Sequence, residues 1–194
     1  MPELACRFLL FALIHSLLAT DRVKGLLCGN RRSITRYYRL LYNLLAMASF
    51  AWVLASLPGS PLLYSLTGYP QIILHSLQAC ALLLLCRCAA QTGLSDFLGI
   101  RQLLTKEKQP PFFTRKGCYG HVRHPQYTVA VIFLLVSPTM TVNHALFTLL
   151  STAYFILGGV LEETRLCDIF GDDYRRYQQE VPMFIPKRFQ RCRN

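Results

Sequence analysis

The chain has 194 residues, of which 53% are hydrophobic and only 16% are charged, and its formal net charge is +11. This length allows one domain and is too short for two of ordinary size. A basic soluble protein that binds nucleic acid spreads Lys and Arg among many charged residues, whereas here charge is sparse and apolar residues form long blocks. The composition therefore favours a membrane protein over a nucleic-acid-binding protein.

Five apolar blocks along the chain are candidate membrane helices. The second and third are close to the roughly 20 residues that a spanning helix needs. The fourth is short, and Pro138 lies directly after it, so we expect the fourth and fifth blocks to form a tight helical hairpin. A soluble all-α domain is the alternative interpretation. In chain order the blocks are Leu4–Thr20, Leu40–Leu57, Pro70–Ala90, Gln126–Ser137 and His144–Leu161.

Positive charge gathers in alternate connections between these blocks. The 21 Lys and Arg residues are Arg7, six residues within 21–39, seven within 87–123 and seven after Glu163, with none in 58–69 or 138–143. The positive-inside rule predicts this alternation for a chain that crosses the membrane several times. We expect an all-α, polytopic bundle of about five spans with a cytoplasmic tail helix. Its N-terminus would lie outside, and its long basic loops and C-terminus in the cytoplasm.

The first block could also be a cleaved signal peptide, but no clear A-x-A cleavage site comes after it. His15 lies within this block and needs a polar partner inside a membrane. That requirement favours a retained helix packed against others.

The cysteines do not form a recognisable metal or redox motif. None belongs to a C-x-x-C pair, and no two such pairs have zinc spacing. We interpret all of them as small apolar side chains in a reducing compartment. They are Cys6, Cys28, Cys80, Cys86, Cys88, Cys118, Cys167 and Cys192.

The basic connections and the tail carry surface features. Residues 36–39 (RYYR) fit either a headgroup-level belt or the wall of a polar pocket. The long connection at 91–125 predicts hidden structure. Within it, an amphipathic stretch could lie on the membrane surface through Phe97, Leu98, Ile100 and Leu104. The tail from Glu162 predicts a helix broken near Gly171, with one apolar face packed on the bundle.

The predicted hairpin brings together charged residues that lie far apart in sequence. The fourth block begins beside Arg123 and His124, and the fifth ends at Glu162 and Glu163, on the same side of the membrane. Charged groups at this depth need partners. The four residues therefore form either a salt-bridged staple for the hairpin or part of a pocket for a charged small molecule. No nucleotide-binding glycine motif is present, and no third ligand completes a metal site with the nearby histidines.

These residues also carry a resemblance to a known family. GCYGHVRHPQY at 117–127, together with EETRLCDIFGDDYRRYQQEVPMFIP at 162–186, resembles the integral-membrane methyltransferase superfamily. That group includes isoprenylcysteine carboxyl, phospholipid and methanethiol S-methyltransferases. The resemblance implies S-adenosylmethionine as cofactor, bound on the cytoplasmic side by the final hairpin and tail. The matching cofactor-binding positions are Tyr119, Arg123, His124, Pro125, Tyr127, Glu162 and Glu163.

Among these positions, the resemblance makes Arg123, His124 and Glu163 the candidate catalytic residues. Arg123 suits the α-carboxylate of the cofactor, a glutamate suits its α-ammonium, and the face of Tyr119 or Tyr127 suits its sulfonium. The resemblance further implies a single methyltransferase domain over 1–194. Its N-terminal three-helix part would be 1–94 and its cofactor-binding part 95–194.

Several segments resemble the methanethiol S-methyltransferase branch, including FFTRKGCYGHVRHPQY at 112–127 and YRRYQQEVPMFIP at 174–186. Carboxyl methyltransferases of the superfamily commonly have an Arg about one turn before the glutamate pair, where this chain has Gly158, Gly159 and Val160. We therefore expect a small thiol or similar apolar nucleophile as acceptor, reached from membrane lipid, with no nucleic acid and no metal. The alternatives are an isoprenylcysteine carboxyl or phospholipid methyltransferase, a non-enzymatic membrane protein of the NnrU type, and a lipid-anchored partner protein.

Overall fold

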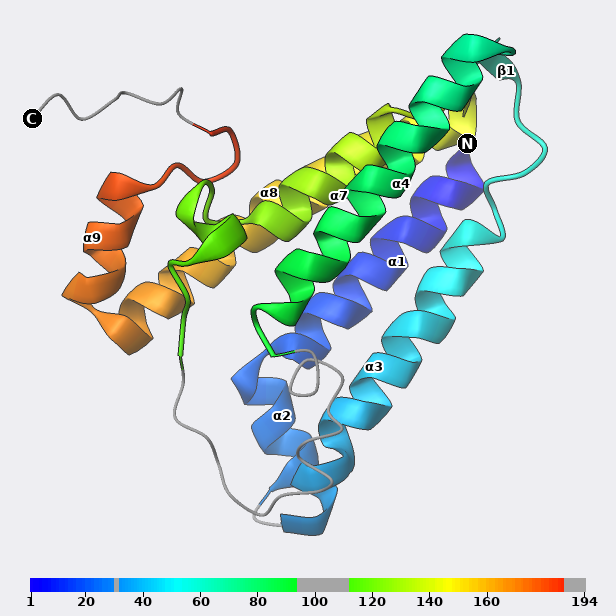
Figure 1. Cartoon of the computed structure of the whole chain (residues 1–194). Coiled ribbons are helices and arrows are strands. Elements are labelled where there is room, and N and C mark those ends of the chain that lie inside the picture. The colour runs from blue at the N-terminus through cyan, green and yellow to red at the C-terminus, as the bar shows by residue number, and fades with distance from the viewer. Residues whose placement is uncertain (30–31, 94–111, 187–194) are drawn as a thin grey trace, which may run out of the picture. The chain divides into compact units, whose positions relative to one another are not determined.

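The computed structural model describes residues 1–29, 32–93 and 112–186. Over these ranges the chain is mainly helical and forms two compact units (Figure 1). Of the described residues, the first unit contains 1–65 and 139–150, and the second contains 66–92, 112–138 and 151–186. The predicted amphipathic stretch at Phe97–Leu104 and the predicted free Cys192 lie outside the described residues.

The first unit is built on α1 (Pro2–Ala19), α2 (Asp21–Cys28) and α3 (Arg32–Leu54), with α1 and α3 side by side (Figure 1). Pro2 starts α1, where a missing N–H costs nothing. Thr20 ends α1 and caps α2, because its side-chain oxygen accepts a hydrogen bond from the N–H of Val23 at 3.3 Å. The sequence pattern indicated a connection at 21–28, whereas these residues form the helix α2.

Aromatic side chains fill the interface between α1 and its neighbours. Phe8 and Phe11 are buried on one face of α1. The ring of Phe8 lies 5.9 Å from that of Phe147, and the ring of Phe11 lies 5.5 Å from that of Phe50. Edge and tilted contacts at these distances stabilise a core beyond simple burial.

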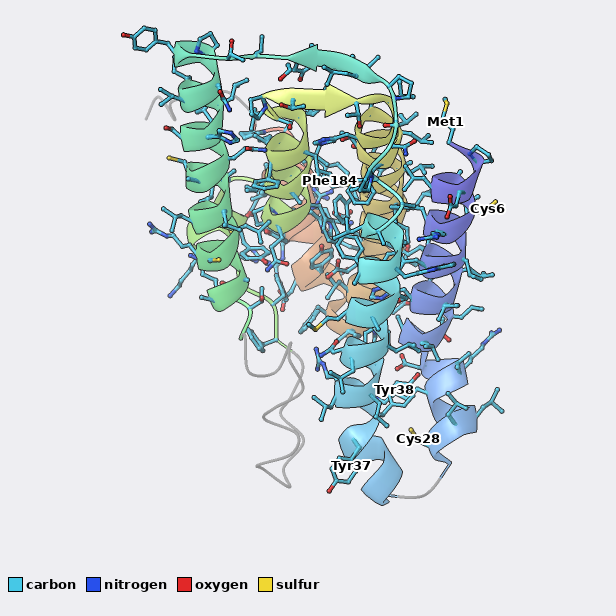
Figure 2. The ribbon with its side chains drawn as sticks, turned by 90° about the vertical axis from the view of Figure 1, so that its right-hand side faces the viewer. Met1, Cys6, Cys28, Tyr37, Tyr38 and Phe184 are labelled. Atoms are coloured by element: carbon cyan, nitrogen blue, oxygen red, sulfur yellow. A yellow bond between two sulfur atoms is a disulfide. The ribbon has the colours of Figure 1, made fainter. Side chains whose placement is uncertain are left out.

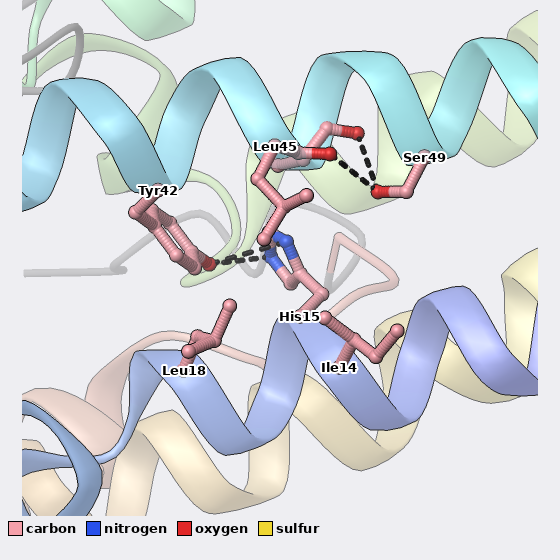
Figure 3. A pocket seen from close by; sticks show the side chains of 7 residues that line it. Ile14, His15, Leu18, Tyr42, Leu45 and Ser49 are labelled. Atoms are coloured by element: carbon pink, nitrogen blue, oxygen red, sulfur yellow. Dashed lines mark hydrogen bonds between the residues drawn. The ribbon is translucent and has the colours of Figure 1, made fainter.

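A polar pair lies within this apolar interface (Figure 3). The hydroxyl of Tyr42 on α3 is 2.7 Å from Nε2 of His15 on α1, beside the aliphatic side chains of Ile14, Leu18 and Leu45. The prediction that His15 needs a partner in a packed helix is thereby confirmed. Tyr38, labelled in Figure 2, adds a second link, because its hydroxyl donates to the carbonyl of Leu18 at 2.7 Å.

A short sheet completes the first unit. β1 (Leu62–Ser65) pairs antiparallel with β2 (Thr139–Thr141), with Tyr64 opposite Met140. Asn143 fixes the neighbouring turn, since its side-chain amide donates to the carbonyl of Ser56 at 3.0 Å. The expectation of an all-α chain is correct for most of the described residues and wrong for these two strands.

The second unit begins with α4 (Tyr69–Ala90), which packs against α7 (Pro125–Leu135) (Figure 1). The amide of Gln78 on α4 donates to the carbonyl of Phe133 on α7 at 3.2 Å. The last turn of α4 is joined to η1 (Gly117–Gly120) by a disulfide between Cys88 and Cys118, whose Cα atoms are 5.8 Å apart. The interpretation of all cysteines as unbonded apolar side chains is wrong for these two, because the fold brings two distant segments into bonding range.

The long helix α8 (Val142–Phe170) contributes residues to both units, and α9 (Asp172–Glu180) comes after it. Gly171 lies between them with a φ of 56°, a left-handed conformation that glycine adopts without strain. The predicted break near Gly171 is therefore confirmed. The fifth apolar block and the helix predicted from Glu162 form one continuous helix, because α8 runs without interruption through Glu162 and Glu163.

Three of the described helices, α1, α4 and α8, are long and apolar enough to cross a membrane, and α7 is a shorter apolar helix. Large apolar side chains on α4 are widely exposed, for example Ile72, Leu82 and Leu83. An exposed face of this kind needs an apolar surrounding. These features are those of an integral membrane protein.

Candidate functional site

The sequence Arg123-His124-Pro125 shapes the start of α7. A residue before proline is disfavoured in the helical region, and proline suits the first turn of a helix. His124 accordingly has φ −120° and ψ 62°, and Pro125 begins the helix. The backbone N–H groups of Arg123 and His124 therefore point away from helical partners and are available to another segment.

That segment is the chain after α9, residues 181–185, which we call the tail strap. The N–H of Arg123 donates to the carbonyl of Pro182 at 2.9 Å, and the N–H of His124 donates to the carbonyl of Met183 at 3.1 Å. The hydroxyl of Thr128 donates to the carbonyl of Phe184 at 3.1 Å. These hydrogen bonds hold the tail strap along the beginning of α7.

A buried ion pair joins the start of α7 to α8. Nε and Nη2 of Arg123 donate to the two carboxylate oxygens of Glu163 at 2.6 and 3.0 Å. The amide of Gln178 on α9 donates to the same carboxylate at 2.8 Å. Nη1 of Arg123 donates to the carbonyls of Gln178 and Val181. The side chains of Arg123 and Glu163 are only 10% and 11% exposed. Each therefore compensates the charge of the other at a place that water hardly reaches.

The ring of His124 lies between the two neighbouring glutamates. Its Nε2 is 3.1 Å from Oε1 of Glu163, and its Nδ1 is 3.7 Å from Oε2 of Glu162. The ring is almost fully buried, whereas the side chain of Glu162 is 48% exposed. The two carboxylates therefore differ in kind: Glu163 belongs to a closed network, and Glu162 is open to a ligand.

Aromatic rings stack beside Glu162. The ring of Tyr127 lies between Phe155 and His124, with centroid distances of 5.1 and 5.3 Å and interplanar angles of 7° and 3°. Phe184 of the tail strap lies 5.7 Å from the ring of His124. The Tyr127 hydroxyl donates to Glu162 at 3.0 Å. A carboxylate beside aromatic faces is a combination that stabilises a cation.

Tyr119 is linked to this cluster through α9. The hydroxyl of Tyr177 donates to the carbonyl of Tyr119 at 2.6 Å. Burial raises the pKa of Tyr177 to about 12, and burial likewise raises the pKa of Tyr119. Both phenols stay protonated at neutral pH, so they act as hydrogen-bonding and aromatic groups rather than as bases.

The structure brings together Arg123, His124, Tyr127, Glu162 and Glu163, and places Pro125 beside them as the first residue of α7. Sequence reasoning missed Gln178, Phe155 and the strap residue Phe184. Gln178 stands in the matched motif YRRYQQE, and that motif was a signal for it. For Phe155 the sequence held no signal beyond its place about two turns before the glutamates.

The residues fit S-adenosylmethionine in part. Glu162 and the adjacent aromatic faces suit its positively charged groups. The role of Arg123 toward the cofactor carboxylate stays a prediction, since its guanidinium is here engaged by Glu163 and two carbonyls. In the described parts of the chain, no three His, Cys, Asp or Glu side chains are arranged to hold a metal ion.

Methyltransferases from several organisms are similar to this chain. A methanethiol S-methyltransferase of Bradyrhizobium diazoefficiens is 41% identical over 97 residues, which are 48% of this chain and 34% of that protein. One of Crocosphaera subtropica is 29% identical over 188 residues, 91% of this chain and 71% of that protein. A protein-S-isoprenylcysteine O-methyltransferase of Schizosaccharomyces pombe is 32% identical over 85 residues, 42% of this chain and 36% of that protein.

The similarity covers only part of most of these proteins. This chain covers 34% of the Bradyrhizobium relative and 38% of a methanethiol S-methyltransferase from a Pseudomonas species, to which it is 40% identical over 99 residues. No family model matches the chain, and no solved structure matches it.

Proposed function

We propose that this chain is a methyltransferase of the isoprenylcysteine methyltransferase-like superfamily and of its methanethiol S-methyltransferase branch, because relatives that bear these names are similar to it. The enzyme works within a membrane, takes its methyl group from S-adenosylmethionine and transfers it to a small thiol. The thiol class is taken from the names of the relatives.

The reaction is a displacement at carbon. S-adenosylmethionine supplies a methyl group on a positively charged sulfur. The acceptor thiol gives up its proton, a sulfur–methyl bond forms, and the methyl–sulfonium bond breaks to leave two neutral thioethers. Such a step depends on alignment and on exclusion of water more than on a covalent catalyst.

The observation that carries this proposal is the difference between Glu162 and Glu163. Glu163, Arg123 and Gln178 form a closed network that fixes the geometry of the site. Glu162 is half-exposed beside the stacked rings of Tyr127 and His124, where a sulfonium or ammonium group gains both charge pairing and aromatic contact. An ion pair that only holds the helices together would not need the second, half-exposed carboxylate of Glu162.

Within this proposal Arg123, His124 and Glu163 serve the chemistry. Glu163 orients His124 through Nε2, and His124 in turn favours the thiolate form of an acceptor placed beside it. Arg123 holds the carboxylate of Glu163 in place for this role. Tyr119, Tyr127, Pro125 and Glu162 form the walls that hold the cofactor.

The proposal includes a topology. The chain makes about five spans, with α7 and α8 as the final hairpin, the N-terminus outside and the basic connections and tail in the cytoplasm. The charged cluster then lies at the cytoplasmic interface, where a water-soluble cofactor can enter. The acceptor arrives through the membrane. The whole of 1–194 acts as one methyltransferase domain, with 95–194 supplying the cofactor site.

The test is methylation by the purified full chain in lipid nanodiscs. Protein is incubated with radiolabelled S-adenosylmethionine and, separately, with methanethiol, a prenylated cysteine and phosphatidylethanolamine. We expect labelled dimethyl sulfide and no labelled product from the other two acceptors. Failure of the protein to bind S-adenosylmethionine by calorimetry, together with no product from any acceptor, would refute the proposal. Labelling of the prenylcysteine alone would reassign the acceptor.

A further inference from the structure

A small notch in α8 lies next to the charged cluster. Gly159 is four residues before Glu163, so both residues are on the same face of the helix, one turn apart. A Cβ atom on Gly159 would lie 2.8 Å from Cε of Met183, 3.2 Å from Cζ of Phe184 and 3.6 Å from Cδ2 of His124. Because glycine has no side chain, Cε of Met183 can lie where a Cβ would otherwise be, and we call this place the Gly159 notch.

The notch depends on this one glycine. A Cβ on the adjacent Gly158 would meet no atom within 4 Å. Gly159 is buried, and three side chains from two other segments converge on it. The absence of a side chain at this position is therefore a packing requirement, whereas at Gly158 it is not.

Met183 is the movable part of the notch. Its backbone is held, because its carbonyl accepts from the N–H of His124 and the carbonyls on either side are also bonded. Its side chain has several rotatable bonds and ends in a flexible thioether. The terminal methyl can leave the notch while the tail strap stays in place.

The end of the Met183 side chain, which occupies the notch, resembles part of a small thiol. The notch holds a methyl group attached to sulfur, and Cζ of Phe184 and Cδ2 of His124 also border it. Phe184 is labelled in Figure 2. A small thiol such as methanethiol presents the same group, a methyl on sulfur, and differs mainly in carrying an S–H.

We propose that the Gly159 notch is the binding site for the alkyl group of the thiol acceptor, and that Met183 occupies it until an acceptor displaces its side chain. This inference rests on the proposed function and adds the site and size limit of the acceptor. The sulfur of the bound thiol then lies beside the ring of His124, whose Cδ2 faces the notch. Gly159 and Met183 are specificity-determining residues.

The notch predicts a strict size limit that two substitutions move in opposite directions. Met183→Ala enlarges the notch, so the ratio of kcat/KM for propanethiol to that for methanethiol should rise roughly tenfold or more, since each methylene in an apolar pocket is worth about that factor. Gly159→Ala fills the notch, so KM for methanethiol should rise roughly tenfold.

Two matched variants serve as controls. Gly158→Ala adds the same methyl group one residue away and should leave the acceptor ratio and KM at wild-type values. Met183→Leu keeps the apolar volume without sulfur and should keep the wild-type acceptor ratio. The affinity for S-adenosylmethionine, measured by calorimetry without acceptor, should change less than about twofold in the two test variants.

The outcomes separate this inference from the proposed function. Active protein in which Met183→Ala leaves the propanethiol-to-methanethiol ratio unchanged would overturn the notch assignment while leaving the methyltransferase proposal intact. Equal increases in KM from Gly158→Ala and Gly159→Ala would also overturn it. Wild-type protein that binds the cofactor and methylates no thiol of the series would overturn the thiol acceptor and the notch together.

Discussion

The interface between α1 and α3 and the cluster around Arg123 use polar groups in opposite ways. In the first, the hydrogen-bonded side chains of His15 and Tyr42 lie among aromatic and aliphatic side chains (Figure 3). In the second, one arginine alone donates to a carboxylate and two backbone carbonyls. Both regions include apolar helices, so the difference is not one of helix composition.

The difference lies in the number of segments that each polar group joins. His15 and Tyr42 connect two helices that already share a continuous apolar interface. Arg123, at the start of α7, donates hydrogen bonds to α8, to α9 and to the first residue of the tail strap. Polar groups therefore support packing in the first region and join the segments directly in the second, which is the proposed cofactor site.

The strongest test of this comparison is removal of the arginine. Arg123→Ala leaves Glu163 as a buried charge without its bidentate partner, which typically costs about 3–5 kcal/mol. Thermal unfolding in detergent, followed by circular dichroism, should show this loss. Arg175→Ala is the control, because Arg175 forms only an exposed pair with Asp172 at 3.4 Å and such pairs contribute about 0–1 kcal/mol. Equal effects of the two substitutions would contradict the view of Arg123 as the organiser of the cluster.

A second test separates the two glutamates. Glu162→Gln keeps the size of the side chain and removes its charge. We expect the affinity for S-adenosylmethionine to fall roughly ten- to a hundredfold, the value of a hydrogen bond to a charged group. Its unfolding temperature should change little, because the side chain is half-exposed.

Glu163→Gln is the matched variant for that experiment. It should lower the unfolding temperature clearly, since it removes the charge that Arg123 and Gln178 surround. If calorimetry shows that Glu162→Gln binds the cofactor as tightly as wild type, Glu162 does not hold a positively charged group and the division of roles fails.

The polar pair of the first unit should give a smaller effect. Tyr42→Phe removes the hydroxyl that bonds His15, and hydrogen bonds between membrane helices are worth about 0.6 kcal/mol on average and up to about 1.7. The double variant His15→Leu with Tyr42→Phe should recover most of this loss, because removing both partners avoids an imperfectly solvated polar group. Unfolding temperatures of the single and double variants measure this. A double variant that is less stable than either single one would show that the pair does more than satisfy its own polarity.

Much of the helical framework can be predicted from the sequence because it depends on local signals. Apolar length marked α1, α4 and α7, and Gly171 marked the turn before α9. The helix α2 was missed although Thr20 and Asp21 are typical of a helix start. A helix was predicted from Glu162, but its continuity with the preceding apolar block was not, because the charged pair Glu162–Glu163 finds its partners only within the fold.

The residues of the site and the approach of Arg123 and His124 to the two glutamates were predictable, but the hydrogen-bond network was not. The matching motifs identified Arg123, His124, Tyr127, Glu162 and Glu163. They did not predict that Arg123 donates to the carbonyls of Gln178 and Val181, because every residue has a backbone carbonyl and the sequence does not mark which one is used. The pairing of β1 with β2 and the bond between Cys88 and Cys118 join segments far apart in the chain. Such contacts are decided by the tertiary fold rather than by local pattern.

The smallest effect concerns the phenols that support the cluster. Because burial raises the pKa of Tyr177 to about 12, the folded protein holds this proton more tightly than the unfolded chain, in which the pKa is about 10. The resulting stabilisation is complete below about pH 10 and is lost as pH rises toward 12. Tyr177→Phe cannot titrate, so its unfolding temperature should fall less steeply than that of wild type over this range, about pH 10 to 12. Other groups also titrate at high pH, so a control is needed that changes an exposed tyrosine. Tyr69→Phe is that control, and its unfolding temperature should fall with pH as steeply as that of wild type. If the unfolding temperature of Tyr177→Phe falls with pH as steeply as that of wild type, Tyr177 is solvated in the folded protein. The packing around Tyr119 would then be looser than the hydrogen bond from Tyr177 to the carbonyl of Tyr119 indicates.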